Sequence, residues 1–184
     1  MKRIFYHVAS LLIASGSVAL FAQEKQPMIG QPAPVFELNS TDGKIYSLNQ
    51  MKGDFVVIHF AATWCPFCNA EAPFLEELYQ QYGNKNVRVI IVDVKEDKTL
   101  VEKSMERFRF SFPVLLDTDG TVSAQYAPEG VQKDLARHEV PIASNLIIDK
   151  DGKIRFYSLL NTESFDARLT KLRQKLDEIL KDRN

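Results

Sequence analysis

The 184-residue sequence predicts an α/β domain with a central mixed sheet flanked by helices. Apolar, β-branched runs at residues 55–60 and 87–94 lie on either side of an amphipathic run at 69–82, which indicates a strand, a helix and a parallel strand. Two later apolar runs, at 145–149 and 153–157, are joined by a Lys-Asp-Gly sequence that predicts a β-hairpin. A sheet with both a parallel crossover and a hairpin is mixed, and the chain length fits one such domain.

The N-terminal residues have the order of a secretory signal peptide. Lys2 and Arg3 precede an apolar stretch at residues 8–21, which ends in the small residue Ala22. We expect residues 1–22 to direct export to the periplasm or another extracytoplasmic space and to be cleaved, with the exact cleavage site left open. The alternative is an uncleaved membrane anchor, because the stretch is nearly long enough to span a bilayer. Its serine and glycine residues favour cleavage.

The sequence next predicts a lead-in and a hairpin. Residues 23–33 are polar and contain prolines, so they are expected to be extended ahead of a domain at 34–184. Runs at 35–38 and 44–48 flank an Asp-Gly pair, which is typical of a β-hairpin.

After the second parallel strand, the pattern predicts shorter elements and a last helix. A helix is expected at 99–109 with Leu100 and Val101 facing inward, then a short strand at 112–117 and a short helix at 122–126. A C-terminal helix that covers one face of the sheet is predicted by apolar residues spaced three and four apart: Phe165, Leu169, Leu172, Leu176 and Ile179.

The two cysteines, Cys65 and Cys68, stand where the predicted strand at 55–60 meets the helix at 69–82. The first N–H groups of a helix are unpaired and carry a partial positive charge, which lowers the pKa of a thiol placed there. Pro66 suits a first helical turn, where its missing N–H is not needed. We therefore expect Cys65 to be the exposed nucleophile and Cys68 to resolve the mixed disulfide.

Other binding chemistries are less well supported. Two cysteines supply half of a closed zinc site, and His7, His59 and His138 do not stand at the usual ligand spacing. We expect no metal and no cofactor other than the redox-active disulfide between Cys65 and Cys68. A formal net charge of −1 gives no reason to expect a nucleic-acid partner.

The sequence Trp-Cys-Pro-Phe-Cys at residues 64–68, after a buried strand, resembles the active site of the thioredoxin superfamily. With Glu71 and Pro73 three and five residues after the second cysteine, the longer pattern is similar to extracytoplasmic TlpA/ResA-like thiol-disulfide oxidoreductases of the AhpC/TSA-Redoxin type. The resemblance covers about residues 28–183. It implies a thioredoxin-like fold with an N-terminal β-hairpin and thiol-disulfide exchange with protein substrates. The commoner task of such proteins is reduction, as in cytochrome c maturation, with electrons from a membrane thiol-disulfide donor.

Two titratable residues are candidates for proton transfer. Glu71 lies one turn after Cys68 on the predicted helix, and the resemblance implies that it tunes cysteine acidity and passes protons. The alternative for Glu71 is an ordinary solvated side chain. His59 stands six residues before Cys65, where thioredoxin has a buried aspartate. It is either a proton relay to Cys68 or a packed core histidine, and both interpretations remain open.

Two aromatic residues flank the cysteines. We expect Trp64 to be exposed beside the disulfide, where it would offer an apolar contact to a substrate protein, with core packing as the alternative. Phe67 stands where thioredoxin has a proline, and it has no donor with which to hydrogen-bond a thiolate.

The resemblance also implies a cis-proline beside the cysteine pair that aligns the substrate chain. Pro141 is the expected residue, but it precedes Asp149 by eight positions, whereas the family proline usually precedes the matching aspartate by six. Ala143 has that spacing, so an insertion after Pro141 and a replacement by Ala143 both remain open. Residues 127–139 are longer than the family norm and are either a specificity loop or a surface insertion.

Two other functions remain as alternatives. Peroxiredoxins share the fold, but they have a threonine three residues before the peroxidatic cysteine, whereas Thr63 precedes Cys65 by two. A non-catalytic thioredoxin-like binding module would use the same surface and would not need Cys65. The residues do not indicate the direction of electron flow, the substrate or the oligomeric state.

Overall fold

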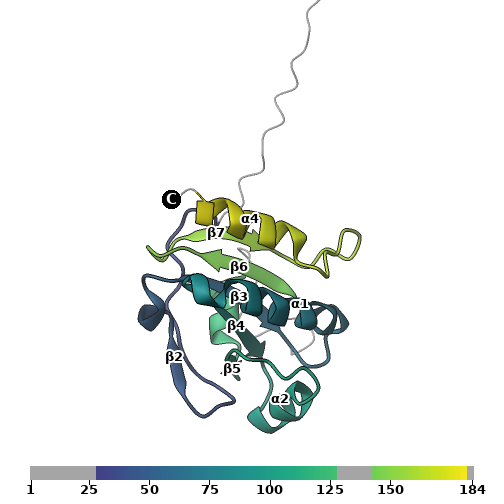
Figure 1. The fold of residues 1–184 in the computed structure, drawn as a ribbon. Coiled ribbons are helices and arrows are strands. Elements are labelled where there is room, and N and C mark those ends of the chain that lie inside the picture. Colours follow the sequence, from purple (N-terminus) through teal and green to yellow (C-terminus); the bar gives the residue numbers. More distant parts are fainter. Residues whose placement is uncertain (1–27, 128–141, 182–184) are drawn as a thin grey trace, which may run out of the picture.

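The computed structural model describes residues 28–127 and 142–181. Its centre is a five-stranded sheet with the strand order β5-β4-β3-β6-β7 (Figure 1). β3 pairs parallel with β4 and antiparallel with β6, so the predicted mixed sheet is confirmed. The strands of this sheet are β3 (Phe55–Ala61), β4 (Val87–Val94), β5 (Val114–Asp117), β6 (Ser144–Ile148) and β7 (Ile154–Ser158).

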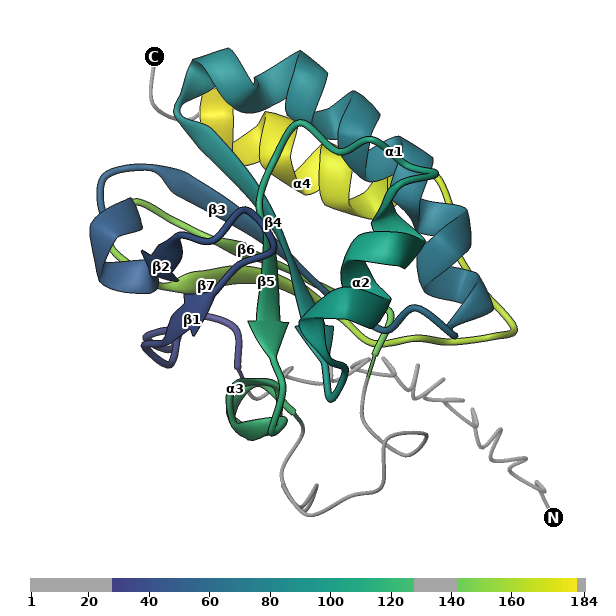
Figure 2. The ribbon, with the colours of Figure 1, turned by 90° about the horizontal axis from the view of Figure 1, so that it is seen from below.

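Both faces of the sheet are covered, which explains why its central strands are apolar at nearly every position. All residues of β3 are buried, and in β4 Arg88 alone is exposed. α1 and α4 lie side by side over one face, and α3 lies on the other side (Figures 1 and 2). The helices are α1 (Pro66–Tyr82), α2 (Lys98–Met105), α3 (Thr121–Gln125) and α4 (Thr170–Lys181), with short 3-10 helices at Leu48–Met51 and Gly83–Lys85.

Polar contacts join α1 to α4. The Tyr82 hydroxyl donates a hydrogen bond to Asp177 Oδ1 at 2.8 Å, and Arg173 Nη2 donates to the Phe74 carbonyl at 2.8 Å. Below these contacts, α4 buries Leu172, Leu176 and Ile179, so the predicted C-terminal helix over one sheet face is confirmed.

Three details of the predicted helices are wrong. The helix expected at 99–109 ends at Met105, and Arg109 has a left-handed φ of 50°. α4 begins at Thr170, so Phe165 and Leu169 precede it instead of forming its first turn. Leu169 has a φ of 56°, a left-handed conformation that cannot continue a right-handed helix. Leu100 is 38% exposed, because the eight-residue α2 buries Val101 as its contact with the core.

The N-terminal hairpin consists of β1 (Glu37–Asn39) and β2 (Ile45–Ser47), as predicted. An antiparallel bridge between Ser40 and Leu115 joins it to the edge strand β5 of the main sheet. Residues 28–33, the described part of the lead-in, are bound to the other edge by backbone hydrogen bonds, including Gly30 N–H to the Ile154 carbonyl at 2.8 Å.

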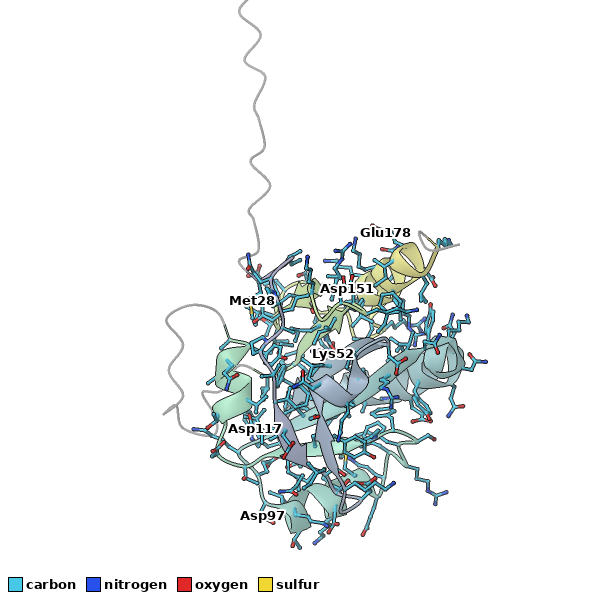
Figure 3. All side chains as sticks on the ribbon, turned by 90° about the vertical axis from the view of Figure 1, so that its left-hand side faces the viewer. Met28, Lys52, Asp97, Asp117, Asp151 and Glu178 are labelled. Atoms are coloured by element: carbon cyan, nitrogen blue, oxygen red, sulfur yellow. The ribbon has the colours of Figure 1, made fainter. Side chains whose placement is uncertain are left out.

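A side chain at the end of β5 caps the helix that follows it. Figure 3 labels Asp117, the last residue of β5, whose carboxylate accepts the backbone N–H groups of Val122 at 3.1 Å and Ser123 at 2.7 Å. These bonds supply acceptors for the first turn of α3.

In residues 28–127 and 142–181, no helix is both long enough and apolar enough to cross a membrane.

Candidate active site

Cys65 lies at the corner between β3 and α1, as predicted. It is the N-cap of α1, with an extended backbone at φ −79° and ψ 113°, and Pro66 is the first helical residue. The Cys68 N–H donates a hydrogen bond to Cys65 Sγ at 3.1 Å. The sulfur of Cys65 therefore occupies the position at which the helix offers unpaired N–H groups and a partial positive charge.

Both cysteines are free thiols, and both are buried. Cys65 is 2% exposed and Cys68 is 4% exposed. The expectation that Cys65 is an exposed nucleophile is therefore wrong for this reduced state. The physical reason is the capping bond, which holds Sγ against the first turn of α1 instead of directing it to solvent.

The two thiols differ in acidity. A side-chain hydrogen bond with Cys68, helped by the backbone N–H groups of Cys68 and Phe67, lowers the pKa of Cys65 to about 7 despite burial. The pKa of Cys68 is raised by its hydrogen bond with Cys65, by burial, and by the negative charges of Cys65 and Glu71. Near neutral pH, Cys65 is therefore partly thiolate while Cys68 remains a thiol, which makes Cys65 the group able to attack.

This difference predicts the thiol titration of the reduced protein. The ultraviolet absorbance of thiolate is expected to rise with a first midpoint near pH 7, from Cys65. In Cys68→Ser the backbone donor remains but the thiol donor is replaced, so the midpoint should move only within about one unit. A first midpoint at the free-thiol value of about 8.5 in the reduced wild-type protein would contradict the capping argument.

Glu71 is a buried carboxyl group beside the cysteine pair. It lies on α1, one turn after Cys68, and is 3% exposed. Burial raises the pKa of Glu71 to about 8, and the charges of Cys65 and Asp166 add to this, while a hydrogen bond from Asn145 opposes it. The alternative of an ordinary solvated glutamate is wrong, because the side chain of Glu71 is buried and its Oε1 accepts a hydrogen bond from Asn145.

His59 and Glu71 meet at Asn145. His59 lies on β3 directly opposite Asn145 on β6, and its Nδ1 is 3.0 Å from Asn145 Oδ1. Asn145 Nδ2 donates to Glu71 Oε1 at 3.0 Å, and His59 Nδ1 is 3.6 Å from Glu71 Oε2. Burial lowers the pKa of His59 to about 4, so the imidazole is neutral at physiological pH. His59 therefore contacts Asn145 and lies near Glu71. A direct proton relay from His59 to Cys68 stays a prediction.

Asn145 is a functional residue that no sequence motif indicated. A signal was present, because Asn145 carries an amide side chain within β6, Ser-Asn-Leu-Ile-Ile, in which every position is buried. A buried amide needs hydrogen-bond partners, which indicates a polar neighbour across the sheet or from a helix. The identity of those partners depends on the pairing of β3 with β6.

The loop before Cys65 is held by a second residue that the sequence did not point to, Glu96. Its carboxylate accepts hydrogen bonds from both the backbone N–H of Thr63, at 2.5 Å, and the Thr63 hydroxyl, at 2.9 Å. Asn69 Nδ2 on α1 donates to the Thr63 carbonyl at 3.2 Å. With the loop bound on both sides, Trp64 is 40% exposed, as expected for a residue beside the disulfide.

A cavity of about 260 Å³ opens next to Glu71, between β6, β7 and the segment that leads into α4. That segment runs past the first turn of α1 (Figure 2). There the rings of Phe67 and Phe165 pack edge to face, with 4.9 Å between their centroids. The residues that line the cavity include Glu71, Ala143, Asn145, Phe165, Asp166 and Leu169.

Ala143 lies at the position whose spacing matches that of the family cis-proline. It is 3% exposed, its φ is 54°, and its N–H donates to the Phe60 carbonyl at 2.8 Å. Pro141 lies outside the described residues, as does the candidate specificity loop at 127–139 except for its first residue, and so does the signal peptide at 1–22. The choice between Pro141 and Ala143 therefore stays a prediction.

Among the residues of the structure that are described, no three His, Cys, Asp or Glu side chains cluster as a metal site would.

Comparison with known proteins agrees with this geometry. The model of the AhpC/TSA family matches residues 29–157. The thiol-disulfide oxidoreductase ResA of Bacillus cereus is 34% identical over 159 residues, which are 83% of this chain and 86% of that protein. Among solved structures, a candidate protein disulfide isomerase from Bacteroides thetaiotaomicron has a TM-score of 0.68 at 29% identity, covering 83% of this chain and 90% of that one. Peroxidoxin BcpB from Mycobacterium tuberculosis has a TM-score of 0.67 at 28% identity, with 83% and 97% covered.

Proposed function

Since this chain belongs to the AhpC/TSA family and is a thiol-disulfide oxidoreductase of the ResA type, we propose that it reduces disulfides of protein substrates outside the cytoplasm. The observation that carries the proposal is the acidity of three groups at the N-cap and in the first two turns of α1. Cys65 has a pKa of about 7, Glu71 has a pKa of about 8, and Cys68 is held as a thiol.

In the first step, the Cys65 thiolate attacks one sulfur of a substrate disulfide. A bond forms between Cys65 Sγ and that sulfur, the substrate disulfide breaks, and the second substrate sulfur leaves as a thiolate that takes a proton from water. The step consumes the negative charge on Cys65. That charge is one of the causes that raise the pKa values of Glu71 and Cys68, so both groups become more acidic once the mixed disulfide has formed.

In the second step, Glu71 accepts the proton of Cys68. The Cys68 thiolate then attacks Cys65 Sγ, the Cys65–Cys68 disulfide forms, and the remaining substrate sulfur leaves as a thiolate. Two electrons have passed from the enzyme to the substrate. Glu71 suits this role because its raised pKa lies near neutral pH, where a carboxyl group is able both to accept a proton and to release it.

The proposed setting is an extracytoplasmic space, and its support is the signal-peptide pattern of residues 1–22. An oxidised enzyme in such a compartment needs two electrons for each new turnover, so a membrane thiol-disulfide donor is the proposed partner. Apocytochrome c cysteines are the proposed substrate class, supported by the resemblance to TlpA/ResA-like proteins. Trp64 is the proposed apolar contact for the substrate chain.

A thiol peroxidase function is less well supported by the contacts around Cys65. The likeness to peroxidoxin BcpB extends to the fold. However, the Thr63 hydroxyl donates its hydrogen bond to Glu96 Oε1 at 2.9 Å and is therefore not directed at the Cys65 sulfur. The geometry favours attack on a disulfide over attack on a peroxide.

The reduction potential of the Cys65–Cys68 pair tests the direction of electron flow. We expect a value near that of thioredoxin, about −270 mV, when the protein is equilibrated against dithiothreitol and glutathione buffers. A potential well above about −200 mV would instead indicate an oxidase or an isomerase. If no reversible disulfide formed at all, exchange chemistry itself would be excluded.

A further inference from the structure

A single amide links the two buried titratable side chains beneath the cysteine pair. Asn145 is 3% exposed, and each of its two side-chain polar atoms contacts one titratable group among the described residues. Oδ1 lies 3.0 Å from His59 Nδ1, and Nδ2 donates to Glu71 Oε1 at 3.0 Å. His59 and Glu71 are themselves 1% and 3% exposed, so water does not replace these contacts.

The chemistry of an amide gives this chain of contacts a direction. Oδ1 accepts hydrogen bonds and does not donate them, so His59 carries its proton on Nδ1. With its oxygen held by His59, the amide directs its N–H at Glu71. An amide nitrogen does not accept a hydrogen bond, so Glu71 Oε1 remains an acceptor whether the carboxyl group is charged or neutral.

The other carboxyl oxygen of Glu71 is therefore the one that carries the proton. Oε2 is buried and has no hydrogen-bond partner among the described residues. It lies 3.6 Å from His59 Nδ1, whose proton is already donated to Asn145. Buried polar atoms without a partner are rare in native structures, and an oxygen that alternately binds and releases a proton accounts for this one.

We propose that Asn145 is a positioning residue for the resolving step: held by His59, its amide directs Glu71 Oε2 to accept the proton of Cys68. The proposal rests on the proposed function, because it needs Glu71 to act as the base. It adds a role for two residues that do not touch the reacting sulfur atoms. It also gives His59 a task through Asn145, in place of a direct relay to Cys68.

Several groups face Glu71, and they act in opposite directions. Cys65 and Cys68 lie on its own helix, His59 faces it from β3, and Asp166 faces it from the segment before α4. Lys171 of α4 lines the same cavity. Burial and the charges of Cys65 and Asp166 raise the pKa of Glu71, whereas the Asn145 hydrogen bond lowers it. Loss of the amide should therefore leave less Glu71 carboxylate at neutral pH.

The resolving step can be measured alone as a single turnover. Cys65 is first converted to a mixed disulfide with thionitrobenzoate, and the release of the coloured thiolate then reports the attack by Cys68. In Asn145→Ala we expect release at pH 7 to be about three- to tenfold slower, with the pH profile displaced upward so that the rates converge at high pH. Asn145→Asp keeps the size but replaces the donor by a second acceptor, and its profile should be displaced further.

Matched variants separate this role from a loss of packing. Ser144→Ala alters the neighbouring position of β6, which points to the opposite face of the sheet, and should leave the profile unchanged. His59→Leu releases the amide oxygen and should displace the profile in the same direction as Asn145→Ala. His59→Gln restores a donor and should recover most of the wild-type rate, and the double variant His59→Leu/Asn145→Ala should be no slower than Asn145→Ala alone.

The outcomes distinguish the inference from the function on which it rests. If Glu71→Gln releases thionitrobenzoate as fast as the wild type at every pH, the proposed role of Glu71 as the base fails. If Glu71→Gln is slow but Asn145→Ala and His59→Leu match Ser144→Ala, the base is right and the positioning role of Asn145 is wrong. A change in rate at all pH values without displacement of the profile would also overturn the positioning role.

Discussion

Replacement of Cys65 by serine is expected to lower the reduction of a protein disulfide by at least about a thousandfold, because a hydroxyl group at neutral pH does not replace the thiolate. Cys68→Ser should behave differently. Its Cys65 still attacks, but no second thiol releases the product, so a covalent complex with the substrate protein should accumulate. The measurement is turnover of a disulfide substrate, together with non-reducing electrophoresis of the two variants mixed with the oxidised substrate.

The pair of variants also separates the alternative functions. A binding module would retain its partner in Cys65→Ser, since association would not depend on the sulfur. A thiol peroxidase would consume peroxide in Cys68→Ser for as long as an external thiol recycled Cys65. Exchange chemistry requires that Cys65→Ser lose turnover and that Cys68→Ser trap the substrate. Full turnover by Cys65→Ser would reject the mechanism.

Replacement of Glu71 by glutamine is expected to stabilise the reduced protein while it slows the resolving step. The pKa of Glu71 is raised from its ordinary value of 4.5 to about 8 in the folded protein. Between these two pH values the unfolded chain releases the proton first, so this group makes the free energy of unfolding fall as the pH rises, and the fall ends above about 8. Glutamine stays neutral throughout.

The expected gain in the free energy of unfolding is roughly 2–5 kcal/mol at pH 9 and close to zero at pH 4, where Glu71 is protonated in both states. Chemical denaturation in the presence of a reductant, at both pH values, measures it. Glu76→Gln on the same helix is the matched control with the opposite sign. The hydrogen bonds from Ser111 and Gln80 lower the pKa of Glu76 despite some desolvation, so its loss should reduce stability at neutral pH. If Glu71→Gln changed stability equally at pH 4 and pH 9, buried charge would not be the cause.

Such a trade of stability for activity is expected where a buried carboxyl group serves chemistry. A residue selected for packing alone would be apolar at the position of Glu71, which is 3% exposed. The same reasoning applies to His59, whose Nε2 is buried and lacks a hydrogen-bond partner within the described part of the chain. Both buried polar side chains lower the stability of the fold, and they lie next to each other near the cysteine pair.

The elements of the fold were largely predictable from local patterns. β4 is found at Val87–Val94, as predicted, because a strand that is buried on both faces is a continuous apolar run in any sequence. The corner at Cys65 was predictable for a related reason. A strand, a short loop, a Cys-Pro pair and an amphipathic helix follow one another in the chain, and helix N-terminal chemistry depends on neighbours in the chain.

Local patterns did not predict the conformation or burial of residues whose environment is formed by distant parts of the chain. The spacing of Phe165 and Leu169 continues that of α4, yet Leu169 has a left-handed backbone and Phe165 packs on Phe67, so α4 begins only at Thr170. Cys65 is buried although most helix N-termini are exposed, because its own capping bond turns the sulfur inward.

By itself, the sequence determined the class of fold, the redox pair, and the acidity expected of a thiol at the start of a helix, since all of these depend on residues within a few positions of one another. Only the tertiary structure decided which buried polar groups meet beside that pair. Asn145 meets His59 and Glu71 across separations of 86 and 74 residues, and those contacts exist because β6 pairs with β3 beneath α1. Burial in that position, and not residue type, gives Glu71 its raised pKa and His59 its lowered one.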